Sequence, residues 1–112
     1  MTSKINQYSV VELSPNGAFN DFISKGLSLV DFYADWCMPC LMMAPILSDL
    51  AEKFKGKIKF GKINIEDAQA LSQKFQVSSI PNMILFKDGE IKERFIGSRS
   101  LEDFEQKLNE FI

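Results

Sequence analysis

The chain has 112 residues, of which 46% are hydrophobic and 25% are charged, a balance that excludes a disordered chain and is typical of one globular domain. The formal net charge of −2 argues against a nucleic-acid partner, because such partners favour a basic surface. The polar segment Met1–Gln7 lacks the apolar region of a secretory signal, and no stretch approaches the ~20 apolar residues that span a membrane. We therefore expect a single domain over residues 1–112, in the cytoplasm and without membrane contact.

The cysteine and histidine content limits the metal sites that the chain can build. It contains two cysteines and no histidine, whereas a structural zinc site is closed by a full tetrahedral set of such ligands. Unless two chains share a site, we expect neither a metal nor another cofactor.

The first third of the chain predicts a strand, a helix and a second strand. Tyr8–Leu13 is predicted to form a short strand, after which Ser14 and Pro15 have the residue types of a helix N-cap and first helical position. The buried face of this helix is expected to contain Phe19, Phe22 and Ile23. Gly26 is placed to end the helix. Leu27–Tyr33 is nearly continuous apolar sequence, which predicts a strand that is covered on both faces.

A long helix is predicted after this strand, and Gly56 is placed to end it. Its apolar face is expected to contain Cys40, Met43, Ala44, Leu47, Leu50, Ala51 and Phe54. Pro45 lies within the pattern and cannot donate a backbone hydrogen bond to the preceding turn, so we expect a kink there. The strand Lys57–Ile65 follows, with Lys62 on the same face as Ile58 and Phe60.

The rest of the chain predicts a short helix, a hairpin and a final helix. The short helix is expected to bury Ala68, Leu71 and Phe75, and the loop Val77–Pro81 follows it. Asp88-Gly89 is a strong hairpin signal between the strands Asn82–Lys87 and Glu90–Ile96. Ser100 is expected to cap the last helix, which would bury Leu101, Phe104, Leu108 and Phe111.

The order of these elements is βαβαβαββα, which predicts an α/β fold. Helical crossovers imply parallel strand pairs early in the chain, and the tight turn implies an antiparallel pair at its end. We expect a mixed sheet of five strands with four helices distributed over both faces. In such sheets the functional crevice lies beyond the carboxyl ends of the strands.

The two cysteines lie within Asp35–Cys40, just beyond the carboxyl end of the predicted strand Leu27–Tyr33. Residues three apart in the first helical turn are close enough to form a disulfide. Cys37, at the helix start, faces unpaired N–H groups and the positive end of the helix dipole, which favour the thiolate. Cys40, one turn further, is expected to be more buried and less acidic. We therefore expect Cys37 to attack a partner disulfide and Cys40 to resolve the mixed disulfide.

A purely structural disulfide is the alternative. Closing so short a loop constrains the unfolded chain by only ~2 kcal/mol, less than a longer loop would give. A chain with ten phenylalanines has enough aromatic core to need little such help. The redox interpretation is therefore preferred.

Asp31 interrupts the apolar strand that leads to Cys37. A carboxylate in such surroundings is costly to bury, and burial should raise its pKa. From beneath the helix it could take the proton of Cys40, directly or through water. Lys62, on a neighbouring strand, is a candidate charge partner, and a structural ion pair without a catalytic part remains the alternative. Pro81 precedes a strand, and its spacing predicts a loop proline without deciding between cis and trans.

Five segments, in this order, resemble those of the thioredoxin family across essentially the whole chain. Val30–Cys40 is similar to the active-site segment, Ala44–Leu47 to the kinked helix and Gly61–Ile65 to the central strand. Ile80–Glu90 resembles the cis-proline strand and hairpin, and Phe95–Gly97 carries the glycine that borders the active surface.

The resemblance implies a thioredoxin fold and a protein-disulfide reductase with disulfide-containing proteins as substrates. It implies Cys37 as the nucleophile, Cys40 as the resolving thiol and Asp31 as the buried acid/base, with Lys62 beside it. It also implies a thioredoxin reductase or an equivalent electron donor, and we expect a monomer.

The resemblance further implies a cis Pro81 beside the disulfide and backbone pairing between Ile80 and the substrate chain. Trp36 would help to form the docking surface, although it could instead only pack against its neighbours. The implied substrate-binding residues are Trp36, Met38, Pro39, Ile80, Pro81 and Gly97.

Two positions depart from the family pattern. Met38 stands where glycine is usual, and residues between the cysteines tune the reduction potential in this family. Leu41 stands where a basic residue is usual, so that one stabiliser of the thiolate is absent. Together with Trp36 and Met42 these side chains would form an apolar patch, unless Met42 and Met43 belong to the core. A disulfide oxidant or isomerase, and a binding module without turnover, remain alternative functions.

Overall fold

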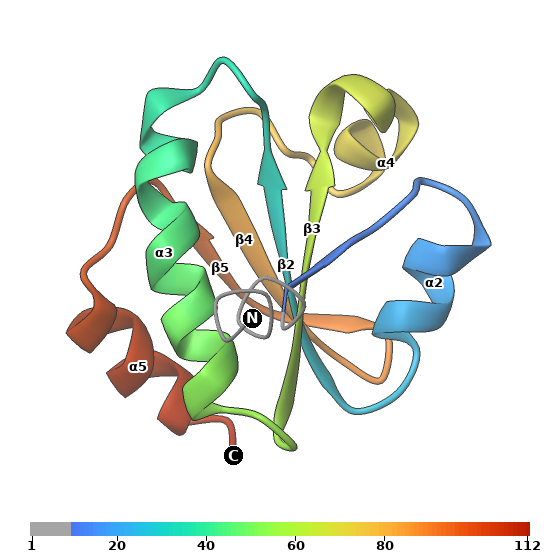
Figure 1. The fold of residues 1–112 in the computed structure, drawn as a ribbon. Coiled ribbons are helices and arrows are strands. Elements are labelled where there is room, and N and C mark those ends of the chain that lie inside the picture. Colours follow the sequence, from blue (N-terminus) through green and yellow to red (C-terminus); the bar gives the residue numbers. More distant parts are fainter. Residues whose placement is uncertain (1–9) are drawn as a thin grey trace, which may run out of the picture.

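The computed structural model describes residues 10–112, in which five strands form one mixed sheet (Figure 1). The strands are β1 (Val10–Glu12), β2 (Leu27–Tyr33), β3 (Ile58–Asn64), β4 (Asn82–Lys87) and β5 (Glu90–Ile96), and they lie in the order β1-β3-β2-β4-β5. β3 pairs with β1 and β2 in parallel, whereas β4 pairs with β2 and β5 in antiparallel fashion. The predicted mixed sheet of five strands is confirmed.

The helices of residues 10–112 cover both faces of this sheet, as expected (Figure 1). They are α2 (Gly17–Ile23), α3 (Met38–Lys53), α4 (Gln69–Lys74) and α5 (Leu101–Asn109). Leu29 of β2 packs in a core cluster with residues of α3 and α5, and the next residue, Val30, packs in a cluster with residues of α2. This alternation places Asp31 on the α3 side of the sheet. None of the helices in this part of the chain is long and apolar enough to cross a membrane.

Two element boundaries differ from those expected. The N-cap of α2 is Asn16 rather than Ser14, because the Asn16 side chain accepts a hydrogen bond from the Ala18 N–H at 2.9 Å. Helix α2 therefore begins at Gly17. The expected first strand began at Tyr8, which lies outside the described residues, and β1 ends at Glu12.

The expected strand Lys57–Ile65 also ends earlier than its sequence suggests. Asn64 accepts a hydrogen bond from the Glu66 N–H at 3.0 Å and thereby caps a short 3₁₀ helix, Ile65–Asp67. Lys62 faces the same side of the sheet as Ile58 and Phe60, as expected, because both of these pack in the cluster beneath α3. Pro45 lies inside α3, and its kink remains a prediction.

The hairpin and the cap of the last helix are confirmed. Asp88 and Gly89 have φ angles of 51° and 86°, the left-handed region that a tight hairpin turn requires. The Asp88 carboxylate accepts a hydrogen bond from the Gly26 N–H at 2.8 Å, and the Asp88 N–H donates to the Gly26 carbonyl at 3.0 Å. The turn is thereby joined to the start of β2. Ser100 caps α5 by accepting from the Asp103 N–H at 3.1 Å.

Gly61 is packed too closely for any larger residue. A Cβ atom there would lie 2.9 Å from Leu13 Cδ1 and 3.0 Å from Phe22 Cε2. Gly61→Ala is therefore expected to lower the free energy of unfolding by about 1–3 kcal/mol, the usual cost of overpacking. Urea denaturation measures this, with Gly17→Ala as the control because no atom lies within 4 Å of a Cβ at that position. Equal stability of the two variants would contradict the prediction.

Candidate active site

The sheet brings the cysteine segment and Pro81 together at the end of the sheet where β2 finishes and β4 begins. Because β2 and β4 are antiparallel, the carboxyl end of β2 meets the start of β4, and Phe32 pairs with Asn82. Cys37 follows β2 after a short connection, and Pro81 immediately precedes β4. The Ile80–Pro81 peptide bond is cis, as the resemblance implied. Gly97, just after β5, lies at the same end of the sheet, where its N–H donates to the Pro81 carbonyl at 2.8 Å.

Cys37 and Cys40 form a disulfide across the first turn of α3. Their Cα atoms are 5.3 Å apart, and Cys37 is the N-cap of the helix. The Cys40 N–H donates to the Cys37 sulfur at 3.2 Å, so the helix N-terminus offers Cys37 a donor that would stabilise a thiolate. Pro39 lies in the first helical turn, where its missing N–H leaves no intrahelical bond unmade.

The expected difference in burial between the two cysteines is wrong. Cys37 is 5% exposed and Cys40 is 4% exposed. Ile65 and Ile80, which come from other parts of the fold, pack against the cluster that Cys37 and Cys40 form with Ala34, and so shield Cys37 as well. The difference between the two residues lies instead in their surroundings. The sulfur of Cys37 receives the helix N–H, whereas Cys40 lines a pocket with Asp31.

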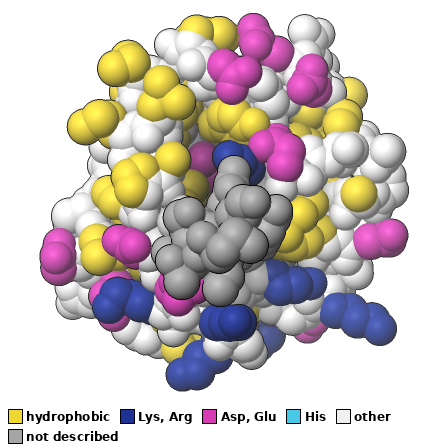
Figure 2. Space-filling model, viewed as in Figure 1, with side chains coloured by type: hydrophobic (Ala, Val, Ile, Leu, Met, Phe, Trp, Pro, Cys, Tyr) yellow, Lys and Arg dark blue, Asp and Glu magenta, His cyan; other side chains and the backbone are white. Residues whose placement is uncertain are grey.

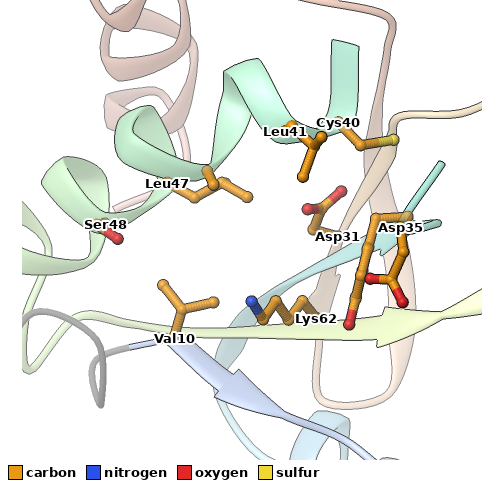
Figure 3. A pocket seen from close by; sticks show the side chains of 10 residues that line it. Val10, Asp31, Asp35, Cys40, Leu41, Leu47, Ser48 and Lys62 are labelled. Carbon is orange, nitrogen blue, oxygen red and sulfur yellow. The ribbon is translucent and has the colours of Figure 1, made fainter. Parts of the chain in front are cut away.

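This pocket has a volume of about 430 Å³ and lies between α3 and the sheet (Figure 3). The Asp31 carboxylate lies between Lys62 and the turn of α3 that carries Leu41 and Cys40 (Figure 3). Asp31 is 3% exposed, and its Oδ1 atom has no hydrogen-bond partner among the described residues. Burial raises the pKa of Asp31 to about 7, against the opposing effect of the Lys62 charge. The carboxyl group can thus exchange a proton near neutral pH.

Lys62 is the neighbour of Asp31 across the β2–β3 pairing, but it is not its partner in a close ion pair. Within residues 10–112, the carboxylate that lies within 4 Å of the Lys62 ammonium is that of Glu12, at 3.9 Å. Lys62 is thus a charge partner of Asp31 through its effect on the Asp31 pKa, without a close ion pair between them. Lys62 acts on Asp31 through its charge at longer range, and its ammonium group lies nearer to Glu12.

Glu12 and Glu66 belong to this region, although the sequence alone did not indicate them. The Tyr33 hydroxyl donates to both carboxylate oxygens of Glu12, at 2.8 and 2.9 Å. Burial and this hydrogen bond raise the pKa of Tyr33, so that the hydroxyl remains a donor. The Trp36 ring N–H donates to Glu66 at 3.1 Å. The cross-strand register, which places Glu12 opposite Lys62, is the signal that would have found Glu12.

Large apolar side chains are exposed around the start of α3. Trp36 and Met38 are each 65% exposed, Leu41 is 52% exposed and Met42 is 68% exposed. We call these four residues the active-end patch. Hydrophobic side chains gather over the N-terminal part of α3 in the surface view (Figure 2). Met43, in contrast, is 1% exposed and belongs to the core, so the two adjacent methionines have different roles.

The chemistry available at this end of the sheet is thiol–disulfide exchange. The two sulfurs can pass between dithiol and disulfide, and a carboxyl group that titrates near neutral pH lies beside one of them. No cluster of three or more Cys, His, Asp or Glu side chains in residues 10–112 is placed to hold a metal ion.

Comparison with known proteins agrees with this chemistry. The family model described as Thioredoxin matches residues 9–110. The chain belongs to the thioredoxin family. The thioredoxin of Chlamydia caviae is 42% identical over 92 residues, which cover 82% of this chain and 89% of the relative. The thioredoxin of Chlamydia pneumoniae is 41% identical over 100 residues, which cover 89% and 97%.

A solved structure and a further sequence relative agree with this family assignment. A mutant thioredoxin from Halobacterium salinarum superimposes with a TM-score of 0.85 at 30% identity, covering 92% of this chain and 90% of that one. The thioredoxin of Staphylococcus saprophyticus is 38% identical over 94 residues, or 84% of this chain and 90% of its own. As a member of the thioredoxin family with a paired Cys37 and Cys40, the protein is an enzyme, a thiol–disulfide oxidoreductase.

Proposed function

We propose that this thioredoxin-family enzyme reduces disulfides in cytoplasmic proteins, acting as a monomeric single domain that a thioredoxin reductase or an equivalent donor recharges. Cys37 is the nucleophile and Cys40 is the resolving thiol. The observation that carries the proposal is the N–H of Cys40, which points at the Cys37 sulfur from 3.2 Å and would stabilise a thiolate there.

Each turnover moves two electrons from the enzyme dithiol to the substrate disulfide. The Cys37 thiolate attacks one substrate sulfur, the substrate S–S bond breaks and the leaving thiolate takes a proton from solvent. Cys40 then gives its proton to Asp31 and attacks the Cys37 sulfur. The mixed disulfide breaks, the second substrate thiolate leaves, and the enzyme is left with the Cys37–Cys40 disulfide.

Asp31 is the proton acceptor for the second step in this proposal. Its carboxyl group lines the same pocket as Cys40, and its pKa is about 7, so the ionised form is available at neutral pH. Lys62 supports this ionised form through its charge. A pKa near the working pH is favourable for a group that must take up and release a proton in each cycle.

The substrate docks beside the disulfide on the active-end patch and the cis-proline loop. Its chain pairs with the backbone of Ile80, next to Pro81 and Gly97, while Pro39 lies at the helix turn between the cysteines. Exposed methionine, leucine and tryptophan side chains favour partners with apolar residues near their disulfide.

Leu41→Lys is expected to shift the appearance of the Cys37 thiolate to lower pH, by up to about one pH unit, because a cation one helical turn away favours the charged sulfur. Thiolate absorbance of the reduced protein, followed against pH, measures this shift. Leu41→Gln is the matched control, since it removes the apolar side chain without adding a charge. Identical curves for the two variants would contradict the prediction.

The alternative, an oxidant or isomerase, is favoured by Met38 and Leu41 at the positions where the family usually has glycine and a basic residue. Equilibration with glutathione buffers distinguishes the two functions. A reduction potential near about −270 mV supports the reductase, and one above about −200 mV supports the oxidant or isomerase.

A further inference from the structure

We infer that Glu12 is a positioning residue that, together with Tyr33, holds the Lys62 ammonium away from Asp31 and so sets the pH range in which Asp31 exchanges its proton. The inference rests on the role of Asp31 in the proposed function. It adds a residue of β1, which lies opposite Lys62, to the control of the second chemical step.

The three charged residues lie in one row across three adjacent strands. Glu12 of β1 pairs in register with Lys62 of β3, and Lys62 pairs in register with Asp31 of β2. Residues opposite each other in neighbouring strands share a face of the sheet. Lys62 therefore stands between two carboxylates, and its flexible side chain can approach either of them.

The structure places the ammonium with Glu12. Lys62 Nζ lies 3.9 Å from Glu12 Oε1 and 5.4 Å from the centre of the Tyr33 ring. The Tyr33 hydroxyl donates to both Glu12 oxygens, at 2.8 and 2.9 Å, and thereby fixes the carboxylate that attracts Lys62. The Tyr33 side chain thus stabilises the Lys62–Glu12 pair in two ways. Its ring lies against the ammonium, and its hydroxyl donates to the Glu12 carboxylate.

Among the described residues, few other charged or titratable groups lie near Asp31. The charged or titratable side chains that face it are Lys62 from β3, Glu12 from β1, Tyr33 from β2, Asp35 after β2 and Cys40 from α3. Its neighbour on β4, Met83, is uncharged. Lys62 is the cation of this set, so the position of its ammonium group largely decides how strongly the ionised carboxylate is stabilised.

Glu12→Gln is the central test, because glutamine keeps an oxygen that can accept from Tyr33 but loses the charge that holds Lys62. We expect the pKa of Asp31 to fall by roughly 0.2–0.7 pH units, the range that one exposed ion pair supplies. Carbon NMR titration of the Asp31 carboxyl group in the oxidised protein measures it. Glu93→Gln is the matched control, since Glu93 pairs with Lys107 from 3.5 Å on β5 and should leave the pKa unchanged.

A second background separates positioning from simple repulsion between Glu12 and Asp31. In Lys62→Met protein, Glu12→Gln should move the pKa of Asp31 by less than in protein with Lys62, because there is no ammonium to release. Equal shifts in the two backgrounds, or no shift in the first, would overturn the inference. The pH profile of disulfide reduction should move with the pKa in Glu12→Gln protein. Failure of the proposed function is seen separately, as an Asp31→Asn variant with an unchanged pH profile, because the titration needs no turnover.

Discussion

Cys37→Ser is expected to lower the rate of insulin-disulfide reduction by on the order of 10⁴-fold or more, as loss of a covalent nucleophile does in other enzymes. A serine hydroxyl is far too weak an acid to attack a disulfide at neutral pH. The expected residual rate is that of the uncatalysed reductant in the assay. The variant loses a disulfide that closes only a short loop, and among the described residues the Cys37 side chain otherwise accepts only the Cys40 N–H, so the variant should remain folded by circular dichroism.

The partner variant tests the division of roles. Cys40→Ser retains the attacking thiol but cannot resolve the intermediate, so a covalent complex with substrate protein should accumulate. Non-reducing electrophoresis and intact mass detect this complex, and a reductant should release it. If instead Cys37→Ser forms the stable complex and Cys40→Ser turns over, the two roles are reversed.

Asp31→Asn is expected to remove a large pH dependence of stability. The pKa of Asp31 is raised from 3.8 to about 7 in the folded protein, so the folded state holds the proton over a range in which the unfolded chain has released it. Stability is therefore highest below about pH 4, falls as pH rises to about 7 and stays low above it. The difference between these pKa values corresponds to about 4 kcal/mol. The variant should lack this loss and be the more stable protein at pH 8.

Urea denaturation at pH 4 and pH 8 measures the loss for each protein. Asp49→Asn is the control, because Asp49 is an exposed carboxylate on α3 and should keep the pH dependence of the original chain. A wild-type protein with equal stability at the two pH values would show that Asp31 is not held in its neutral form. Such a result would also weaken its proposed role as a proton acceptor.

Much of the fold could be predicted from local patterns. The continuous apolar run of β2, the helical spacing in α3 and the Asp88-Gly89 turn each determine their element through nearby residues alone. The same local reading identified Asp31, since a carboxylate inside an apolar strand is conspicuous without a structure. Boundaries were less predictable, because Ser14 and Asn16 are both good caps and only the bond from Ala18 decides between them.

The surroundings of the site depend on contacts that the sequence does not display. Glu12 lies far before Lys62 in the chain, and only the β1–β3 register brings them opposite each other. The similar burial of the two cysteines arises in part from Ile65 and Ile80, which reach them from other parts of the fold. Spacing along α3 therefore predicted which residue caps the helix but not how much solvent each sulfur contacts.

The paired bonds between Gly26 and Asp88 have a consequence at the opposite end of the sheet. They fasten the residue just before β2 to the turn after β4, at 2.8 and 3.0 Å, and so oppose sliding of one strand along the other. A slip of one residue would turn every side chain of a strand to the wrong face. It would also carry Pro81 away from Cys37. The alignment of Pro81 with the cysteine segment is thus maintained in part by Gly26 and Asp88, which lie at the other end of the sheet from the sulfur atoms.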